Sequence, residues 1–135
     1  MITIVLVDDH KIVRSGIARL LEDEPDLKVI GEGANGMEGI EAARTLKPDI
    51  LVSDLMMNGL TGIDVAREVK KVSPQTRTII LTMYNDAGYI ARSMQEGAMG
   101  YVLKGSGIDD LVEAIRQVGG GNIYLSPDIT EKHLG

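Results

Sequence analysis

Four short apolar segments of the sequence end in residues suited to phosphoryl chemistry. Asp8 and Asp9 follow residues 2–7, Asp54 follows 50–52, Thr82 follows 78–81 and Lys104 follows 99–103. Carboxylates held close together repel one another, so a cluster of three needs a cation. Mg²⁺ suits it because this ion prefers oxygen ligands and keeps several waters. Since a carboxylate can also act as a nucleophile, these residues predict a magnesium-dependent phosphoacceptor site, provided that the fold brings them together.

The Thr82 hydroxyl and the Lys104 ammonium also fit this hypothesis. In phosphoryl transfer the protein mainly positions the reactants and neutralises the charge of three equatorial oxygens. We expect Mg²⁺ to bind one of these oxygens, Lys104 a second, and Thr82 with a backbone N–H the third. Taken singly, the aspartates are equally explained as helix caps, Thr82 as a strand-end residue and Lys104 as a solvated side chain. Their shared position at the ends of different apolar segments favours the functional interpretation.

The apolar segments are typical of strands buried on both faces of a parallel sheet, because they are continuous and rich in β-branched residues. There are five, at residues 2–7, 27–30, 50–52, 78–81 and 99–103. Between and after them apolar residues recur at helical spacing, as in Val13, Ile17, Leu20 and Leu21, in Ile90, Met94 and Ala98, and in Leu111, Ile115 and Val118. This alternation predicts an α/β fold with a doubly wound, five-stranded parallel sheet and five helices. Ligands of such sheets bind at the carboxyl ends of the strands, where the candidate residues stand.

Composition limits the partners of the chain. Its 135 residues suit one domain, and its net charge of −6 argues against direct contact with nucleic acid, which needs clustered lysine and arginine. The absence of cysteine excludes a disulfide framework and a thiolate zinc site. The first residues lack the features of a signal peptide, so none is expected, and the sequence has no run of about 18 apolar residues. We therefore expect a cytoplasmic protein without a membrane partner.

Four segments carry a resemblance to a known family: VDDH, SDLMMNGLTGID, ILTMYND and GAMGYVLKGS, which begin at Val7, Ser53, Ile80 and Gly97. In this order and at these spacings, they resemble the receiver domains of bacterial two-component response regulators, over residues 2–120. The resemblance implies a flavodoxin-like receiver fold with strand order 2-1-3-4-5. It also implies a signalling switch that a sensor histidine kinase phosphorylates, rather than an enzyme with a separate substrate.

The resemblance implies a role for each matching residue. The phosphoacceptor aspartate is matched by Asp54. The Mg²⁺ ligands, which are three carboxylates and one backbone carbonyl, are matched by Asp8, Asp9, Asp54 and Met56. The residues that stabilise the phosphoryl group and carry the switch are matched by Thr82, Tyr101 and Lys104. Asn58 and Gly105 stand where the family usually has proline. The family's peptide after the lysine is usually cis, and a cis peptide before Gly105 would be costly because the bond lacks proline.

The sub-type is indicated by the DDH start, the LTMYND loop, the KGS segment and the GGGNIYLSP end, which resemble regulators of the LuxR/NarL (FixJ) type. This resemblance implies a receiver domain at residues 1–120 and the start of a linker at residues 121–135. The linker would lead to a C-terminal helix-turn-helix domain that is absent from this chain. Contact with DNA is expected through that domain alone, and a homodimer is expected on phosphorylation.

Alternatives remain open at this point. The chain could be a stand-alone receiver, a pseudo-receiver that serves as an interaction module, or a small phosphatase with an aspartate nucleophile. Such phosphatases carry a D-x-D motif after the first strand, whereas Asp8 and Asp9 are adjacent. The G-x-G-x-x-G pattern at residues 31–36 suggests a dinucleotide site, but it follows the second strand and contains Glu32. The two histidines, His10 and His133, are far apart in the sequence, so a histidine-based metal site is not expected.

Overall fold

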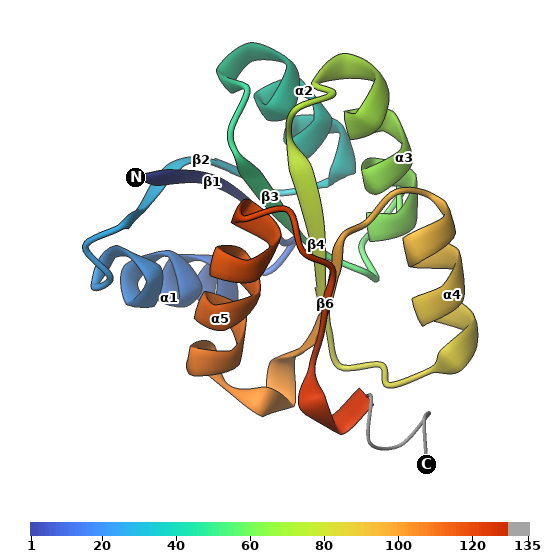
Figure 1. Ribbon diagram of the computed structural model, residues 1–135. Coiled ribbons are helices and arrows are strands. Elements are labelled where there is room, and N and C mark those ends of the chain that lie inside the picture. Colours follow the sequence, from blue (N-terminus) through green and yellow to red (C-terminus); the bar gives the residue numbers. More distant parts are fainter. Residues whose placement is uncertain (130–135) are drawn as a thin grey trace.

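Strands and helices alternate along residues 1–129, which are the residues that the computed structural model describes (Figure 1). The strands are β1 (Ile2–Val7), β2 (Leu27–Gly33), β3 (Ile50–Asp54), β4 (Arg77–Thr82), β5 (Gly100–Leu103) and β6 (Tyr124–Leu125). The helices are α1 (Lys11–Glu22), α2 (Gly36–Leu46), α3 (Gly62–Val72), α4 (Ala87–Gln95) and α5 (Ile108–Gly119), with a 3₁₀ turn η1 (Lys104–Ser106) before α5. The predicted α/β class is confirmed.

The sheet is parallel throughout and has the order β2-β1-β3-β4-β5-β6. The predicted order of the first five strands is confirmed, and the predicted strand count is one too low. The additional strand, β6, lies beside β5 and pairs Tyr124 with Gly100 and Leu125 with Tyr101. It falls within residues 121–135, which the sequence assigns to the start of a linker. That domain boundary stays a prediction, and residues 130–135 lie outside the described part of the chain.

Helices cover both faces of the sheet. Figure 1 shows α1 and α5 on one face and α2, α3 and α4 on the other. Along β1, Ile4 and Leu6 enter the core under α1 and α5, whereas Val5 and Val7 enter the core under α2 and α3. Burial on both faces explains why the strands appear as continuous apolar runs in the sequence. Each such side chain contributes roughly 1.5–3 kcal/mol by leaving water.

One helix is shorter than its apolar stripe predicts. Helix α4 ends at Gln95, so Ala98 lies beyond it rather than on its stripe. Gly97 has a φ of +107° and ends the helix, because this left-handed conformation suits glycine. The backbone N–H of Ala98 then donates to the carbonyl of Ser93, and the N–H of Gly97 to that of Met94. This Schellman closure turns the chain and buries Ala98 in the core instead.

The glycine-rich loop at residues 31–36 packs a helix against the sheet. A Cβ at Gly33 would lie 2.8 Å from the backbone nitrogen of Gly39, so the residue must be small. Asn35 caps α2 by accepting from the N–H of Glu38, and Glu32 pairs with Arg14 at 2.8 Å. This loop therefore serves close packing. None of the described helices has the length and apolar character needed to cross a membrane.

Candidate functional site

The strand register places the candidate side chains at one edge of the sheet. Val7 pairs with Ser53, so Asp8 and Asp54 come next to each other at the ends of β1 and β3. Asp54 pairs with Leu81, the residue before Thr82, and Thr82 pairs with Leu103, the residue before Lys104. Each candidate thus stands at the carboxyl end of a neighbouring strand, where ligands bind in open α/β sheets.

Lys104 joins two of the carboxylates. Its Nζ lies 3.4 Å from Asp8 Oδ2 and 3.3 Å from Asp54 Oδ2. The side chains of the two aspartates are only 6% and 10% exposed, and that of Lys104 is 21% exposed. The alternative of a solvated surface lysine is therefore wrong. A charge-assisted contact in such a dry environment is stronger than the same contact on the surface.

Burial dominates the electrostatics of Asp54. It raises the pKa of this carboxyl above its usual range, because the charged form loses water. The charge of Lys104 acts in the opposite direction and lowers the pKa, whereas the neighbouring Asp8 raises it further. One ammonium thus does not offset the cost of the buried negative charge.

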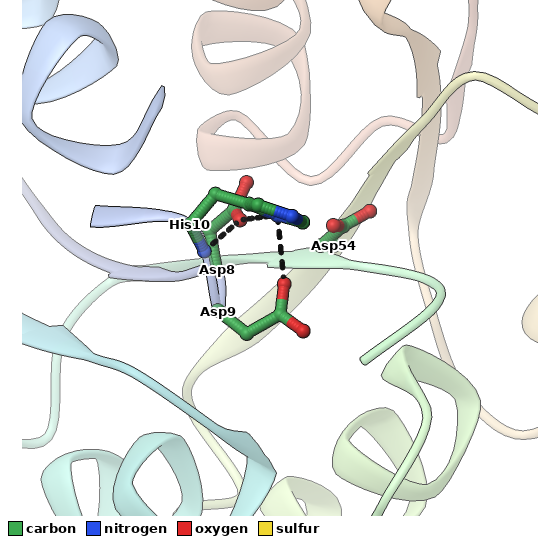
Figure 2. Close-up of side chains that lie close together, drawn as sticks. All are labelled: Asp8, Asp9, His10 and Asp54. Carbon is green, nitrogen blue, oxygen red and sulfur yellow. Dashed lines mark hydrogen bonds and ion pairs between the residues drawn. The ribbon is translucent and has the colours of Figure 1, made fainter. Parts of the chain in front are cut away.

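Two more side chains complete the cluster. Figure 2 shows Asp8, Asp9, His10 and Asp54 gathered at this edge, with one potential ligand atom from each lying within 4.8 Å of the others. Asp9 Oδ1 is buried, and its nearest polar neighbour is His10 Nδ1 at 2.9 Å. Three carboxylates that meet at this edge of the sheet fit a hard cation such as Mg²⁺.

Helix capping does not explain the aspartates. The N-cap of α1 is His10, whose side chain makes no capping hydrogen bond, and Asp8 Oδ1 accepts from the backbone N–H of His10 at 2.9 Å. This bond belongs to the turn after β1 and orients the Asp8 carboxylate. Helix α3 is capped by Thr61 and Asp64, which form a reciprocal capping box, and not by Asp54.

Thr82 and Tyr101 are linked through one backbone unit. Thr82 Oγ1 accepts from the N–H of Tyr84 at 3.2 Å, and the Tyr101 hydroxyl donates to the carbonyl of Tyr84 at 2.6 Å. Both side chains are buried, and burial raises the pKa of Tyr101, which keeps its hydroxyl a donor. Both side chains therefore hold the β4–α4 loop at Tyr84. The groups that link Thr82 and Tyr101 are the backbone N–H and carbonyl of Tyr84, so no pattern of residue types in the sequence could have revealed the link.

The loop after β3 contains the first of the two sequence departures, Asn58, and leads to one residue that sequence reasoning missed. Met56 is 43% exposed. In the turn at Asn58, the positive φ falls on Gly59 at +86°, while Asn58 keeps a negative φ. The missed residue is Gly62, the first residue of α3, where a Cβ would lie 2.5 Å from the Asp54 carbonyl oxygen. Its position just after a capping threonine is the signal that could have marked it.

The second departure, Gly105, lies in η1. No peptide bond among residues 1–129 is cis, so the peptide between Lys104 and Gly105 is trans. The lysine reaches the carboxylates from this geometry, since its contacts with Asp8 and Asp54 are in place.

Similar proteins support the same assignment. The chain is 39% identical to response regulator GacA of Pseudomonas aeruginosa over 132 residues, which is 98% of this chain and 62% of that protein. It is 37% identical to the transcriptional regulatory protein LnrK of Bacillus subtilis, over 99% of this chain and 61% of that protein. The chain thus spans about three fifths of the length of these curated relatives.

A solved structure agrees with the fold. The crystal structure of a LuxR-family two-component response regulator from Aurantimonas superposes with a TM-score of 0.93 and 36% identity, covering 100% of this chain and 99% of the other. The family model for the response regulator receiver domain matches residues 4–116. This match includes the ends of strands β1, β3, β4 and β5. The chain therefore belongs to the response regulator receiver domains of two-component systems.

Proposed function

We propose that Asp54 is the phosphoacceptor of this receiver domain. The observation that carries the proposal is the ammonium of Lys104, held 3.3 Å from Asp54 and 3.4 Å from Asp8 at the carboxyl edge of the sheet. A phosphohistidine of a sensor kinase is the proposed donor. The Asp54 oxygen attacks phosphorus, the bond between phosphorus and the histidine nitrogen breaks, and the imidazole keeps the electron pair and takes up a proton.

The residues of this chain position and neutralise the transferred group. Asp8, Asp9 and Asp54, together with the backbone carbonyl of Met56, would hold Mg²⁺. When bound, Mg²⁺ supplies positive charge next to the phosphoryl oxygens. Lys104 pairs with a second oxygen of the group, and the Thr82 hydroxyl donates to a third. Asp8, Asp54 and Lys104 already lie together at the sheet edge, so these groups need little reorganisation, whereas the Thr82 side chain turns toward the transferred group.

The proposed switch acts through Tyr84. A phosphoryl group on Asp54 attracts the Thr82 hydroxyl, which then gives up its bond with the Tyr84 N–H. Tyr101 is fully buried, and its hydroxyl donates to the Tyr84 carbonyl, so the same peptide unit connects it to Thr82. Phosphorylation therefore shifts the equilibrium between two arrangements of the β4–α4 loop, which changes the surface formed by α4, β5 and α5.

The proposed output is transcriptional control in the cytoplasm. A relative that matches this chain over 99% of its length is named as a transcriptional regulatory protein, and it is longer than this chain. We infer that phosphorylation promotes a homodimer, and that a helix-turn-helix domain after residue 135 makes the contact with DNA. The net charge of −6 supports this division of labour, since an acidic domain is repelled by the phosphate backbone.

Intact-mass spectrometry tests the phosphoacceptor. The protein is incubated with acetyl phosphate, a small phosphoryl donor, with and without Mg²⁺. We expect one phosphoryl mass on the wild type with Mg²⁺, and none on Asp54→Asn. Asp23→Asn is the matched control, because Asp23 is exposed at the far end of α1, roughly 18 Å along a 12-residue helix.

Two outcomes would reject the proposal. An Asp54→Asn protein that gains the group at the wild-type rate would show that another residue is the acceptor. Continuous multiple-turnover hydrolysis of a phosphate ester would identify the chain as a phosphatase with an aspartate nucleophile instead.

A further inference from the structure

Arg14, near the start of α1, is a largely buried charged side chain to which the proposed function gives no role. Its side chain is only 12% exposed. Nη1 donates to the backbone carbonyl of Asp8 at 2.6 Å, and Nε donates to Glu32 Oε1 at 2.8 Å. From its place on α1, the guanidinium therefore bridges the end of β1 and the edge strand β2.

The contact with Asp8 fixes the peptide unit between two members of the acidic site. The carbonyl of Asp8 and the N–H of Asp9 belong to one planar unit, so a hydrogen bond to the carbonyl restrains both residues. On its other side, Asp8 donates its own N–H to the carbonyl of Gly33 at 3.1 Å. Glu32 and Gly33 are consecutive, so the end of β2 holds Asp8 directly through its backbone and indirectly through Arg14.

An ordinary ion pair that fastens α1 to β2 is the alternative explanation for Arg14. The Glu32 side chain is 40% exposed, and ion pairs with an exposed partner contribute little to stability. Such a pair also needs no contact with Asp8, a residue that is only 4% exposed. A hydrogen bond from a charged donor is roughly twice as strong as one between neutral groups. The bond to the Asp8 carbonyl is therefore the contact by which Arg14 can influence the site.

We propose that Arg14 is a positioning residue of the phosphoacceptor site, and that it holds the peptide unit between Asp8 and Asp9 in the conformation that binds the cation. This role rests on the proposed function and adds a residue of the first helix, with its anchor Glu32 on β2, to the groups that serve it. Glu32 lies in the glycine-rich segment at residues 31–36, which thereby contributes to the site as well as to close packing.

The guanidinium has two possible effects on Mg²⁺ binding, and they have opposite signs. As a positive charge it repels the cation, so that its removal would strengthen binding. As a positioning group it keeps the two aspartates in place, so that its removal weakens binding. The direction of the change thus separates positioning from the effect of charge.

Isothermal titration calorimetry of the whole 135-residue chain with Mg²⁺ measures this direction. Arg14→Met removes the guanidinium but keeps an unbranched apolar side chain, and Arg19→Met is the matched control, because Arg19 is exposed in the last turn of the same helix. We expect Arg14→Met to weaken Mg²⁺ binding about 10-fold. At saturating Mg²⁺, its rate of phosphorylation by acetyl phosphate should stay within about twofold of the wild-type rate, since only the binding of the cation is impaired.

Backbone ¹⁵N relaxation without metal supplies a readout that does not depend on Mg²⁺. In Arg14→Met, the order parameter of the Asp9 N–H should fall from about 0.85 to below about 0.6, and in Arg19→Met it should not change. If Arg14→Met does not fold, Arg14→Lys takes its place. It keeps the charge but loses the planar fork, and we expect its Mg²⁺ affinity to be at least about threefold weaker than that of the wild type.

The outcomes distinguish this role from the proposed function. Unchanged or tighter Mg²⁺ binding by Arg14→Met would overturn it, because the guanidinium would then act by charge or not at all. Wild-type affinity in Arg14→Lys, where that variant replaces the first, would overturn it as well, and so would an equal loss of affinity in Arg19→Met. A wild-type protein that does not bind Mg²⁺ would reject the proposed magnesium site, whereas a loss of order at Asp9 in Arg14→Met would still support the positioning role.

Discussion

At the scale of single residues, the position of Asp54 depends on the close approach of the first turn of α3 to the backbone at the end of β3. The first turn of α3 lies against the end of β3: the N–H of Gly62 donates to the carbonyl of Leu55 at 2.8 Å. A Cβ at Gly62 would meet the Asp54 carbonyl oxygen at 2.5 Å and the Ile80 side chain at 3.0 Å. Since the first of these is a backbone atom, the strand end would have to move, and the Asp54 carboxylate with it.

Gly62→Ala tests this packing. We expect a loss of about 1–3 kcal/mol in the free energy of unfolding, the usual cost of overpacking, together with slower phosphorylation by acetyl phosphate. Urea unfolding and intact-mass kinetics measure the two effects. Gly105→Ala is the control, because an added Cβ there would meet nothing within 4 Å. Equal stability of the two variants would show that the close approach at Gly62 is not required.

The residues of the site differ in how visible they are in the sequence. Asp8, Asp54, Thr82 and Lys104 could be predicted, because each stands at the carboxyl end of a strand that is recognisable by its apolar residues: Asp54 and Thr82 are the last residues of β3 and β4, and Asp8 and Lys104 follow β1 and β5. His10 could not be assigned, since its place at the cluster depends on the direction of its side chain after an extended backbone. The same holds for contacts to backbone groups: their chemistry is identical at every residue, so only the folded geometry distinguishes one from another.

At the scale of elements, the segment from Ile123 to Ile129 forms a C-terminal strap over the edge of β5. The N–H of Ser126 donates to the carbonyl of Tyr101 at 3.1 Å, and Ser126 Oγ accepts from the N–H of Leu103 at 2.9 Å. The strap also packs into the core around Tyr101: Ile129 is 1% exposed and belongs to the same core cluster as this tyrosine. The end of the described chain at Ile129 therefore packs in the same core as the Tyr101 side chain.

Ser126 is the residue that fastens the strap. Its hydroxyl donates to Asp110 of α5, which also accepts from the Tyr124 hydroxyl, while it accepts from the N–H of Leu103. Ser126→Ala leaves that buried N–H without a partner, which costs about 1–3 kcal/mol. We expect faster amide hydrogen exchange in residues 123–129, with β1 to β4 unchanged.

Hydrogen-exchange mass spectrometry measures this effect segment by segment. Ser15→Ala is the matched control, because Ser15 is exposed on α1. If Ser126→Ala left exchange in the strap unaltered, the hydroxyl contacts would not hold it in place.

The strap also shows where sequence-based prediction of elements ends. Strands β1 to β5 are four to seven residues long and mostly apolar, so each can be recognised as a continuous apolar run. Strand β6 has two residues, which is too short for such a run, and its partners on α5 and β5 are distant in sequence. Its pairing depends on tertiary contacts and not on local propensity.

At the scale of the whole molecule, the clustered charges that the proposed function requires lower the stability of the folded protein. The three carboxylates and one ammonium at the sheet edge lie in a protein whose net charge is already −6. Asp54 is more stable as the neutral acid than it would be in water, as its raised pKa indicates. A bound cation relieves this cost, and a ligand that binds only the folded state stabilises it in proportion to its concentration relative to Kd. The fold should therefore be more stable with Mg²⁺ than without it.

The sign of the pH dependence follows from the raised pKa of Asp54. Between the unperturbed value of 3.8 and the higher pKa of the folded state, the folded protein binds more protons than the unfolded chain. The contribution of this carboxyl to stability is therefore fully present below pH 3.8 and is lost as the pH rises through the folded pKa. Asp54→Asn removes the ionisable group but keeps its shape, and Lys104 retains Asp8 as a partner.

With EDTA present, we accordingly expect Asp54→Asn to have a higher Tm than the wild type at neutral pH. The difference should shrink as the pH falls toward 3.8. Saturating Mg²⁺ should raise the Tm of the wild type more than that of the variant, because the variant has lost one carboxylate ligand. Differential scanning calorimetry across this pH range measures both effects, with Asp23→Asn as the variant that loses an exposed carboxylate instead. A wild type that is more stable than Asp54→Asn at neutral pH in EDTA would mean that the Lys104 contact outweighs the burial of the charge.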